Sequence, residues 1–120
     1  MTTVLVIDDS PSEMAKFRDM LARHNFKVLE AINGEQGCQM AIDHLPDVIL
    51  MDVVMPEMNG FQATRKITRG KTTAHIPVIM ISTKNQETDR VWGKRQGAKE
   101  YMAKPVDENE LVNIIRKVME

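Results

Sequence analysis

Three acidic side chains follow short apolar stretches of the sequence. Asp8 and Asp9 come directly after the apolar run 4–7, and Asp52 comes directly after the run 48–51. Carboxylates that share one cleft repel one another, so they need either raised pKa values or a bound cation. Mg²⁺ prefers oxygen ligands and is commonly held by one or two carboxylates together with phosphate oxygens. If the fold brings the three acids together, they predict a magnesium site, in which Mn²⁺ is the expected substitute.

Hydroxyl groups and a lysine follow two later stretches. Ser82 and Thr83 come after the apolar run 78–81, and Lys104 ends a weaker candidate strand, 100–103. Each feature alone has a simpler explanation, because strand-end hydroxyls and acids often cap helices or satisfy backbone groups. Together they place a polar residue after each of four predicted strands, which favours a functional site. The lysine would supply a positive charge that can contact a transferred phosphoryl group.

The apolar runs themselves predict a parallel sheet. The runs 4–7, 27–29, 48–51 and 78–81 are continuous rather than alternating, and they are rich in β-branched residues. Such runs are typical of strands buried on both faces. The fifth and poorest candidate, 100–103, is stopped by a proline.

The segments between the runs have the spacing of helices. The clearest has apolar residues at i, i+3, i+4 and i+7, after Asp107 as a helix N-cap with Glu110 three residues on. Strands that alternate with helices predict an α/β fold with a doubly wound, five-stranded parallel sheet and helices on both faces. Ligands of such folds gather at the carboxyl ends of the strands. The apolar helical positions are Met14, Phe17 and Leu21, then Met40, Ala41 and Leu45, and finally Leu111, Ile114, Ile115 and Val118.

Composition narrows the class of protein. The 120 residues show no composition break, so we expect a single domain over 1–120; 42% are apolar and 28% charged. A net charge of −1 gives no electrostatic footprint for nucleic acid or anionic membranes. No apolar stretch approaches the roughly 20 residues that cross a bilayer. Without a basic leader, and with Cys38 unable to form an internal disulfide, the expected location is the cytoplasm.

Four motifs resemble the response-regulator receiver family in their order and spacing. They are I-D-D-S, L-M-D-V-V-M-P-E-M-N-G, P-V-I-M-I-S-T and Y-M-A-K-P, and they extend over essentially the whole chain. The resemblance implies a flavodoxin-like, CheY-like (βα)5 fold that serves two-component signalling. It implies a phosphoacceptor switch that catalyses only its own phosphoryl transfer and dephosphorylation, with a CheA-like histidine kinase as donor. With no output domain expected, the signal would pass through contact with a partner protein.

The resemblance also implies a role for individual residues of the acidic cluster. Asp52 resembles the phosphoacceptor, Asp9 a direct metal ligand, and Asp8 an acid that acts through water. Val54 resembles the position whose backbone carbonyl binds the metal.

Further roles follow from the later motifs. Ser82, with Thr83 beside it, resembles the switch hydroxyl, and Lys104 the phosphate-contacting lysine. Tyr101 resembles the aromatic residue that changes between exposed and buried rotamers, and the bond to Pro105 is a candidate cis peptide.

A surface on the fourth helix and fifth strand is the expected partner site. Aromatic and arginine side chains are enriched at interfaces, and this segment combines both kinds. The expected partner surface consists of Lys84, Arg90, Trp92, Lys94, Arg95 and Tyr101. Within the family, the stretch from Trp92 to Ala98, with Gln86 to Asp89 before it, resembles the small stand-alone regulators of twitching motility, the PilH type. That resemblance implies a pilus motor or motility machinery as the output partner and a role in twitching motility or a chemotaxis-like response.

Two positions depart from the chemotaxis pattern, and three alternative functions fit the sequence less well. Val54 and Lys84 stand where chemotaxis receivers have polar or acidic side chains that orient the hydrolytic water. An aspartyl-phosphate phosphatase would need a second acid at Val54, and a flavodoxin-type cofactor binder would need a glycine- and hydroxyl-rich loop in place of Asp8 and Asp9. The third alternative is an unphosphorylated pseudo-receiver that acts only as a docking module.

Overall fold

The computed structural model of the chain describes all residues 1–120, and strands alternate with helices throughout. The order predicted from the sequence, five strand–helix pairs, is confirmed. The elements are β1 (Thr3–Ile7), α1 (Pro11–Ala22), β2 (Lys27–Ala31), α2 (Gly34–His44), β3 (Val48–Asp52), α3 (Gly60–Thr68), β4 (Val78–Ser82), α4 (Glu87–Arg95), β5 (Glu100–Ala103) and α5 (Glu108–Val118).

The five strands form one parallel sheet in the order β2-β1-β3-β4-β5. The chain runs from β1 outward to β2, then returns past β1 and continues in the other direction through β3, β4 and β5. The direction of winding therefore reverses between β1 and β3. Ligands of doubly wound folds bind at this point, outside the carboxyl ends of the strands.

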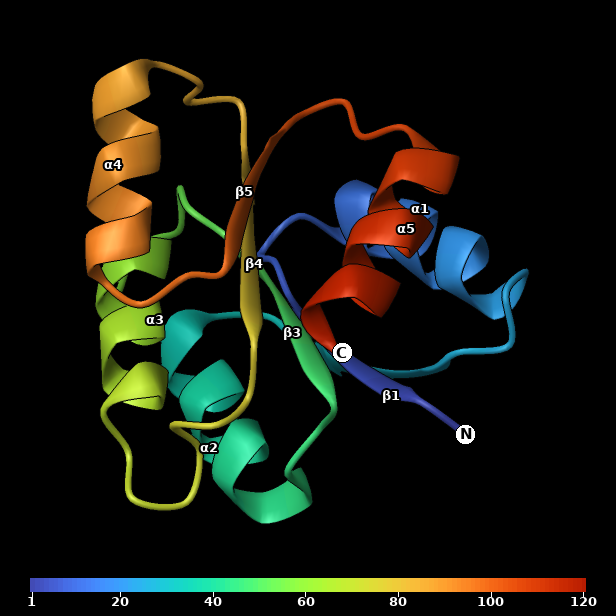
Figure 1. Cartoon of the computed structure of the whole chain (residues 1–120), viewed down its shortest axis with the longest axis horizontal. Helices are drawn as coiled ribbons and strands as arrows, with labels where there is room; N and C mark the ends of the chain where they lie inside the picture. The colour runs from blue at the N-terminus through green and yellow to red at the C-terminus, as the bar shows by residue number, and fades with distance from the viewer.

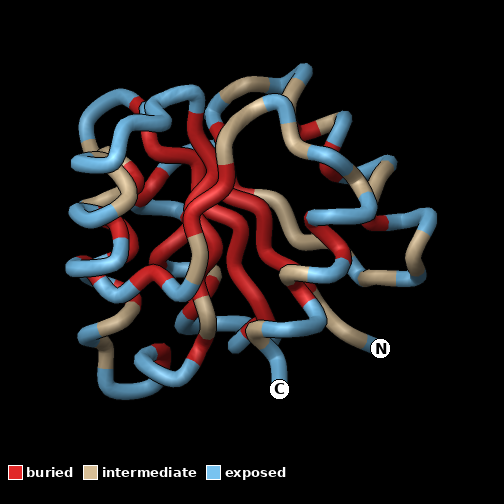
Figure 2. The backbone as a smooth tube through the Cα atoms, turned by 45° about the horizontal axis from the view of Figure 1, so that its top comes forward, coloured by how far each residue is buried: buried red, intermediate tan, exposed pale blue.

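Helices cover both faces of the sheet, as predicted. Figure 1 shows α1 and α5 on one side of the strands and α2, α3 and α4 on the other. Each face has its own apolar core: Phe17 and Leu111 pack on the first side, and Ala41 and Ile67 on the second. The central strands β1, β3 and β4 are buried almost throughout, whereas the edge strands β2 and β5 are partly exposed (Figure 2). None of the five helices has the length and apolar character that a membrane span requires.

Side-chain caps fix where the helices begin. Asn33 and Asn59 accept hydrogen bonds from backbone N–H groups three residues on, and Asp107 accepts one from the N–H of Glu110 at 2.9 Å. The predicted N-cap of α5 is thereby confirmed, although the side chain of Glu110 does not bond back to complete a capping box.

One predicted apolar position of the second helix is wrong. Leu45 is 49% exposed and lies just beyond α2 as its C-cap, with a left-handed φ of 44°. The apolar spacing continues past the helix end, but the backbone turns there and directs the side chain to solvent. The other predicted apolar helix positions are buried or packed against the core.

Candidate functional site

The three predicted acids meet at the carboxyl ends of β1 and β3. Ile7 pairs with Met51 in the parallel ladder, so Asp8, directly after β1, and Asp52, the last residue of β3, lie side by side. Carboxylate oxygens of Asp8, Asp9 and Asp52 all lie within 4.8 Å of one another. The acids therefore form one cluster at the position where the winding of the sheet reverses.

Lys104 lies against two of these acids. Its Nζ is 3.2 Å from Oδ2 of Asp8 and 3.1 Å from Oδ1 of Asp52. Since β5 is the edge strand beyond β4, the lysine reaches back across the end of the sheet to make these contacts. One ammonium group cannot neutralise three carboxylates, so the cluster keeps an excess of negative charge.

The cluster shifts the proton affinities of its members. Burial, followed by the nearby charge of Asp8, raises the pKa of Asp52 to about 6, and Lys104 opposes this rise. Burial alone would lower the pKa of Lys104, but the charges of Asp52 and Asp8 outweigh it and raise that pKa above its usual value. At neutral pH the lysine is therefore charged and Asp52 is mostly an ionised carboxylate in a poorly solvated position.

The donor set fits a hard divalent cation. Asp8 is buried, and its two oxygens already accept hydrogen bonds from the N–H of Ser10 and from Lys104. The side chain of Asp9 is exposed and makes no hydrogen bond, and the carbonyl of Val54 accepts none. Oxygen ligands with uncompensated negative charge are the groups that Mg²⁺ prefers. The residues that could hold the ion directly are Asp9, Asp52 and Val54, with Asp8 behind them.

Gly60, the last residue of the second receiver-like motif, holds the loop after Asp52. The N–H of Gly60, the first residue of α3, donates to the carbonyl of Val53 at 2.8 Å. A Cβ atom on Gly60 would lie 2.2 Å from the backbone oxygen of Asp52. Only glycine allows α3 to begin this close to the strand end. The Asn59-Gly60 dipeptide was the available signal, but the contact it serves is visible only in three dimensions.

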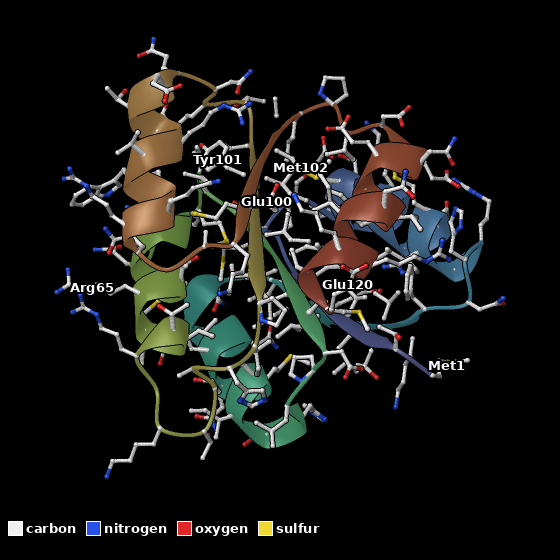
Figure 3. The ribbon with its side chains drawn as sticks, viewed as in Figure 1. Met1, Arg65, Glu100, Tyr101, Met102 and Glu120 are labelled. Atoms are coloured by element: carbon white, nitrogen blue, oxygen red, sulfur yellow. The ribbon has the colours of Figure 1, made fainter.

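Ser82 and Tyr101 are linked through one backbone residue, Lys84. The buried hydroxyl of Ser82 accepts a hydrogen bond from the N–H of Lys84 at 3.0 Å, and Tyr101 donates its O–H to the carbonyl of Lys84 at 2.6 Å. Successive side chains Tyr101 and Met102 point to opposite faces of the sheet (Figure 3). The structure therefore places Tyr101 inward, below α4, at 5% exposure rather than on the predicted partner surface.

The remaining predicted positions of this region lie in or beside the same loops. Thr83 is exposed directly after β4, and the N–H of Lys104 donates to the carbonyl of Ser82. The Lys104–Pro105 peptide bond is cis.

The predicted partner surface is divided between two sides of α4. Arg90 faces β5, where its guanidinium lies 5.6 Å from the centre of the Tyr101 ring and donates to the Tyr101 carbonyl. Lys94 lines a shallow hollow on this same side. Trp92 instead lines a hollow between α3 and α4. Lys84 and Arg95 are exposed.

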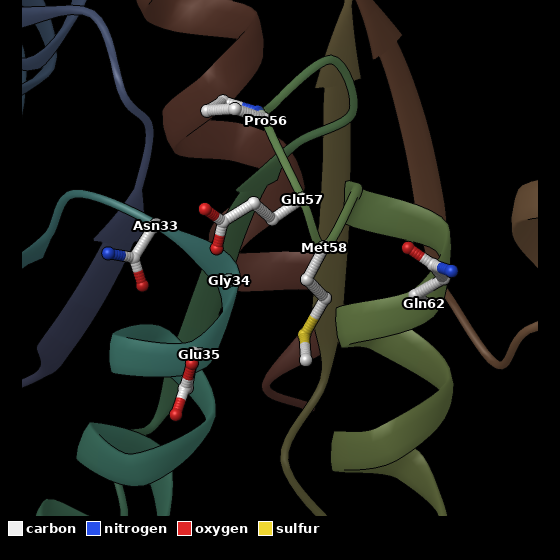
Figure 4. A pocket seen from close by; sticks show the side chains of 7 residues that line it. All are labelled: Asn33, Gly34, Glu35, Pro56, Glu57, Met58 and Gln62. Atoms are coloured by element: carbon white, nitrogen blue, oxygen red, sulfur yellow. The ribbon is translucent and has the colours of Figure 1, made fainter.

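A separate hollow of about 380 Å³ lies between the beginnings of α2 and α3 (Figure 4). Asn33, the N-cap of α2, and Glu35 in its first turn line one side, and Glu57 and Met58 line the other from the loop after Asp52. Glu57 adopts a left-handed φ of 66°. None of the clustered acids lines this hollow, and its two glutamates gather no cationic partner, so it is not the site of the predicted chemistry.

Comparison with known proteins identifies one matching family and several relatives. A family profile described as "Response regulator receiver domain" matches residues 4–116. Protein PilH from Pseudomonas aeruginosa is 54% identical over 119 residues, which is 99% of this chain and 98% of that protein. Several other curated relatives are longer, and this chain spans about half of their length or less.

Solved structures of receiver proteins have the same fold as this chain. The chemotaxis protein CheY4 from Vibrio cholerae superposes with a TM-score of 0.92 and 28% identity, over 98% of each chain. The receiver domain of the sensor histidine kinase PA1611 from Pseudomonas aeruginosa has a TM-score of 0.91 and 27% identity, over 98% of this chain and 97% of that one. That structure has a magnesium ion coordinated in its active-site cleft.

Proposed function

We propose that this chain, which belongs to the response regulator receiver family of two-component signalling, accepts a phosphoryl group on Asp52 with Mg²⁺. The observation that carries the proposal is the convergence of Asp8, Asp9 and Asp52 within 4.8 Å, with Lys104 against two of them. A nucleophilic carboxylate, two further acids for a cation and a fixed ammonium group are the parts that phosphoryl transfer to an aspartate requires.

The reaction begins with a carboxylate oxygen of Asp52 opposite the phosphorus of the donor. A new O–P bond forms while the bond from phosphorus to the donor atom breaks, and the donor atom leaves with the electron pair. Lys104 offsets the charge that spreads over the equatorial oxygens of the loose transition state. Asp9, Asp52 and the Val54 carbonyl would hold Mg²⁺, which would neutralise more of that charge. The chain acts on itself only, so it is a switch rather than an enzyme with turnover of other substrates.

The switch acts through Ser82 and Tyr101. The acyl phosphate adds about −1.5 to −2 charges and three acceptor oxygens at neutral pH. The Ser82 hydroxyl, which now accepts from the Lys84 N–H, becomes a donor to a phosphoryl oxygen and draws the loop toward the site. Because Tyr101 bonds to the carbonyl of the same Lys84, the movement reaches α4 and β5.

The proposed partners are a CheA-like histidine kinase as phosphodonor and a protein of the pilus or motility machinery as output. The resemblance of the α4 segment to twitching-motility regulators and the 54% identity to PilH support this. We place the activity in the cytoplasm, where such kinases present their phosphohistidine. Expression of the chain in Pseudomonas aeruginosa that lacks PilH should restore wild-type twitching, and an Asp52→Asn variant should not. Failure of the wild-type chain would remove the twitching assignment and leave the receiver chemistry to the next experiment.

Intact-protein mass measurement after incubation with acetyl phosphate tests the chemistry. The wild-type chain should gain one phosphoryl group with Mg²⁺ and none with a chelator. The Asp52→Asn variant should gain none in either condition, while its circular dichroism stays that of the wild type. A chain that never gains the group, although folded and supplied with Mg²⁺, would be a pseudo-receiver, and the proposal would fail.

A further inference from the structure

The charge of this chain is unevenly distributed along its sequence. Between Glu57 and Glu87 the chain contains no acidic residue. Residues 58–100 contain nine basic residues against three acidic ones, whereas residues 1–57 contain four basic residues against ten acidic ones. The near-zero net charge of the whole chain therefore hides a basic half, which includes α3 and α4, and an acidic half.

The basic half contains an exposed aromatic side chain beside a hollow. Trp92, the only tryptophan of the chain, is 48% exposed. With Phe61, Arg65 and Gln96 it lines a hollow of about 260 Å³ between α3 and α4. Arg95 lies one helical turn beyond Trp92 on the same side of α4. We call the surface formed by Phe61, Arg65, Trp92 and Arg95 the α3–α4 face.

The arginines of this face differ from those on the opposite side of the sheet. Arg18 and Arg23, on and after α1, form ion pairs with Glu30 and Glu108. The side chains of Arg65 and Arg95 have no acidic partner and donate no hydrogen bond to the chain. Arg65 extends from α3 away from the sheet (Figure 3). Two guanidinium groups thus lie beside an exposed indole without an internal partner.

Two unpaired arginines beside an exposed tryptophan are suited to binding an acidic protein segment. Arginine pairs with carboxylates through two parallel hydrogen bonds, and tryptophan and arginine are the residues that most often dominate binding energy at interfaces. The hollow beside Trp92 can take an apolar side chain of the same partner. A long polyanion such as nucleic acid fits less well, because the molecule has a net charge of −1 and an acidic half that would repel phosphates beyond this face.

We propose that the α3–α4 face docks an acidic segment of a partner protein, with carboxylates on Arg65 and Arg95 and an apolar side chain against Trp92. This face lies on the side of α4 away from Tyr101, so it adds a second contact surface to the one that the switch residues would alter. Binding at the α3–α4 face does not require a phosphoryl group on Asp52. It is tested without a phosphodonor, so its failure and the failure of the phosphorylation proposal can be told apart.

The test is selection of random twelve-residue peptides on the full chain, followed by titration of the enriched peptides. Trp92 emission reports the binding, since burial of a half-exposed indole shifts it to shorter wavelength. The enriched peptides should be rich in Asp and Glu and should contain an aliphatic or aromatic residue. Their affinity should fall roughly tenfold or more in the Arg65→Glu, Arg95→Glu double variant. The matched control is Lys16→Glu, Lys27→Glu, which makes the same charge change at exposed positions elsewhere and should bind like the wild type.

Three results would overturn the proposal. One is enrichment of peptides without acidic character. The second is equal affinity for the wild type and the Arg65→Glu, Arg95→Glu variant, with circular dichroism showing that both are folded. The third is tighter, Arg65- and Arg95-dependent binding of a twelve-nucleotide single-stranded DNA or RNA than of any enriched peptide, which would make the face a nucleic-acid site.

Discussion

At the scale of single residues, Asp52 combines two opposing requirements. It must be ionised to attack phosphorus, yet its burial and the neighbouring Asp8 raise its pKa to about 6. Lys104 works against that rise and keeps the carboxylate mostly charged at neutral pH. The nucleophile is therefore poorly solvated and carries an electrostatic cost in the metal-free protein, which a divalent cation or the loss of the charge would relieve.

This cost makes Asp52→Asn a stabilising substitution in the absence of metal. Well below the ordinary pKa of 3.8, Asp52 is protonated in both the folded and the unfolded chain, so the substitution has little effect. As the pH rises toward 6, the unfolded chain releases the proton and the folded one retains it, so wild-type stability falls relative to the variant. Urea unfolding in the presence of a chelator should show the variant more stable by about 1 kcal/mol at pH 7. This figure is smaller than the pKa shift alone would give, because solvent partly screens the site and the substitution weakens the contact to Lys104. A variant that is less stable than the wild type at pH 7 would contradict this reading of the site.

Val54 and Lys84 govern how long the phosphoryl group should last. Val54 is 58% exposed beside the acceptor, and its side chain offers no hydrogen bond to a hydrolytic water. Lys84 reaches only a 4.0 Å contact with Asp89, so its flexible stem is a poor clamp for water. Loss of phosphate from the purified wild type should therefore be slower than from a Val54→Asn, Lys84→Glu double variant. Equal or slower loss from the double variant would rule out this account of water access.

At the scale of elements, two helices begin with the same Asn-Gly pair but in different surroundings. A Cβ atom on Gly60 would lie 2.2 Å from the backbone oxygen of Asp52, whereas a Cβ atom on Gly34 would lie 3.0 Å from the backbone oxygen of Met58 and 3.1 Å from its side chain. Gly60→Ala should cost about 3 kcal/mol of unfolding free energy and abolish phosphorylation of Asp52, because the backbone must move. Gly34→Ala should stay within about 1 kcal/mol of the wild type, because a 3.0 Å contact needs a shift of only a few tenths of an ångström and the methionine side chain can adjust.

Urea unfolding and the acetyl phosphate assay measure both effects of this glycine pair. Similar losses of stability in the two variants would show that helix-start geometry matters at both positions alike. The close approach of α3 to Asp52 would then not be the cause.

The junction of α1 and α5 depends on one glutamate. Glu108, the first residue of α5, accepts from the Arg23 guanidinium and from His24 Nε2 after the end of α1. These bonds, that of Arg23 foremost, lower the pKa of Glu108 from 4.5 to about 2. A carboxyl group with a lowered folded-state pKa stabilises the fold above its unfolded pKa and loses that effect as the pH falls.

Glu108→Gln should therefore be less stable than the wild type at pH 6, and the difference should shrink as the pH falls from 4.5 toward 2. Urea unfolding across this range measures it. The control is Glu110→Gln, which removes a charge from the same helix turn without breaking an ion pair. If the stability loss of Glu108→Gln did not change with pH, or if Glu110→Gln lost as much, the effect would come from the general electrostatics of the helix start rather than from the contacts with Arg23 and His24.

The elements also show how far a sequence predicts a fold of this kind. The continuous apolar runs of β1, β3 and β4 predict buried parallel strands, because these strands are covered on both faces. The edge strands β2 and β5 are partly exposed and have weaker runs, yet both were found. The prediction for Leu45 was wrong because apolar spacing does not show where a helix ends. The closeness of Gly60 to Asp52 depends on contacts between separate elements, which local patterns do not contain. For the same reason, the sequence could not separate Arg90 and Trp92 onto opposite sides of α4.

At the scale of the whole molecule, the sheet order explains why so few residues suffice for the site. Asp8, Asp9, Asp52 and Lys104 are spread over most of the chain, yet parallel strands deliver all of them to one edge. The Ser82–Lys84–Tyr101 connection leads from that edge toward α4, and the α3–α4 face lies on the far side of the same helix. The proposed chemistry thus lies at one end of the molecule, and α4 has a proposed contact surface on each side.

The central claim is that Asp52, and neither of its acidic neighbours, carries the phosphoryl group. Borohydride reduces an acyl phosphate of aspartate to homoserine, so tandem mass spectrometry of the digested chain identifies the acceptor directly. After incubation of the wild type with acetyl phosphate and Mg²⁺, homoserine should appear at position 52 alone, and a chelator should prevent it. Homoserine at position 8 or 9, or its absence from position 52 with Mg²⁺ present, would contradict the account.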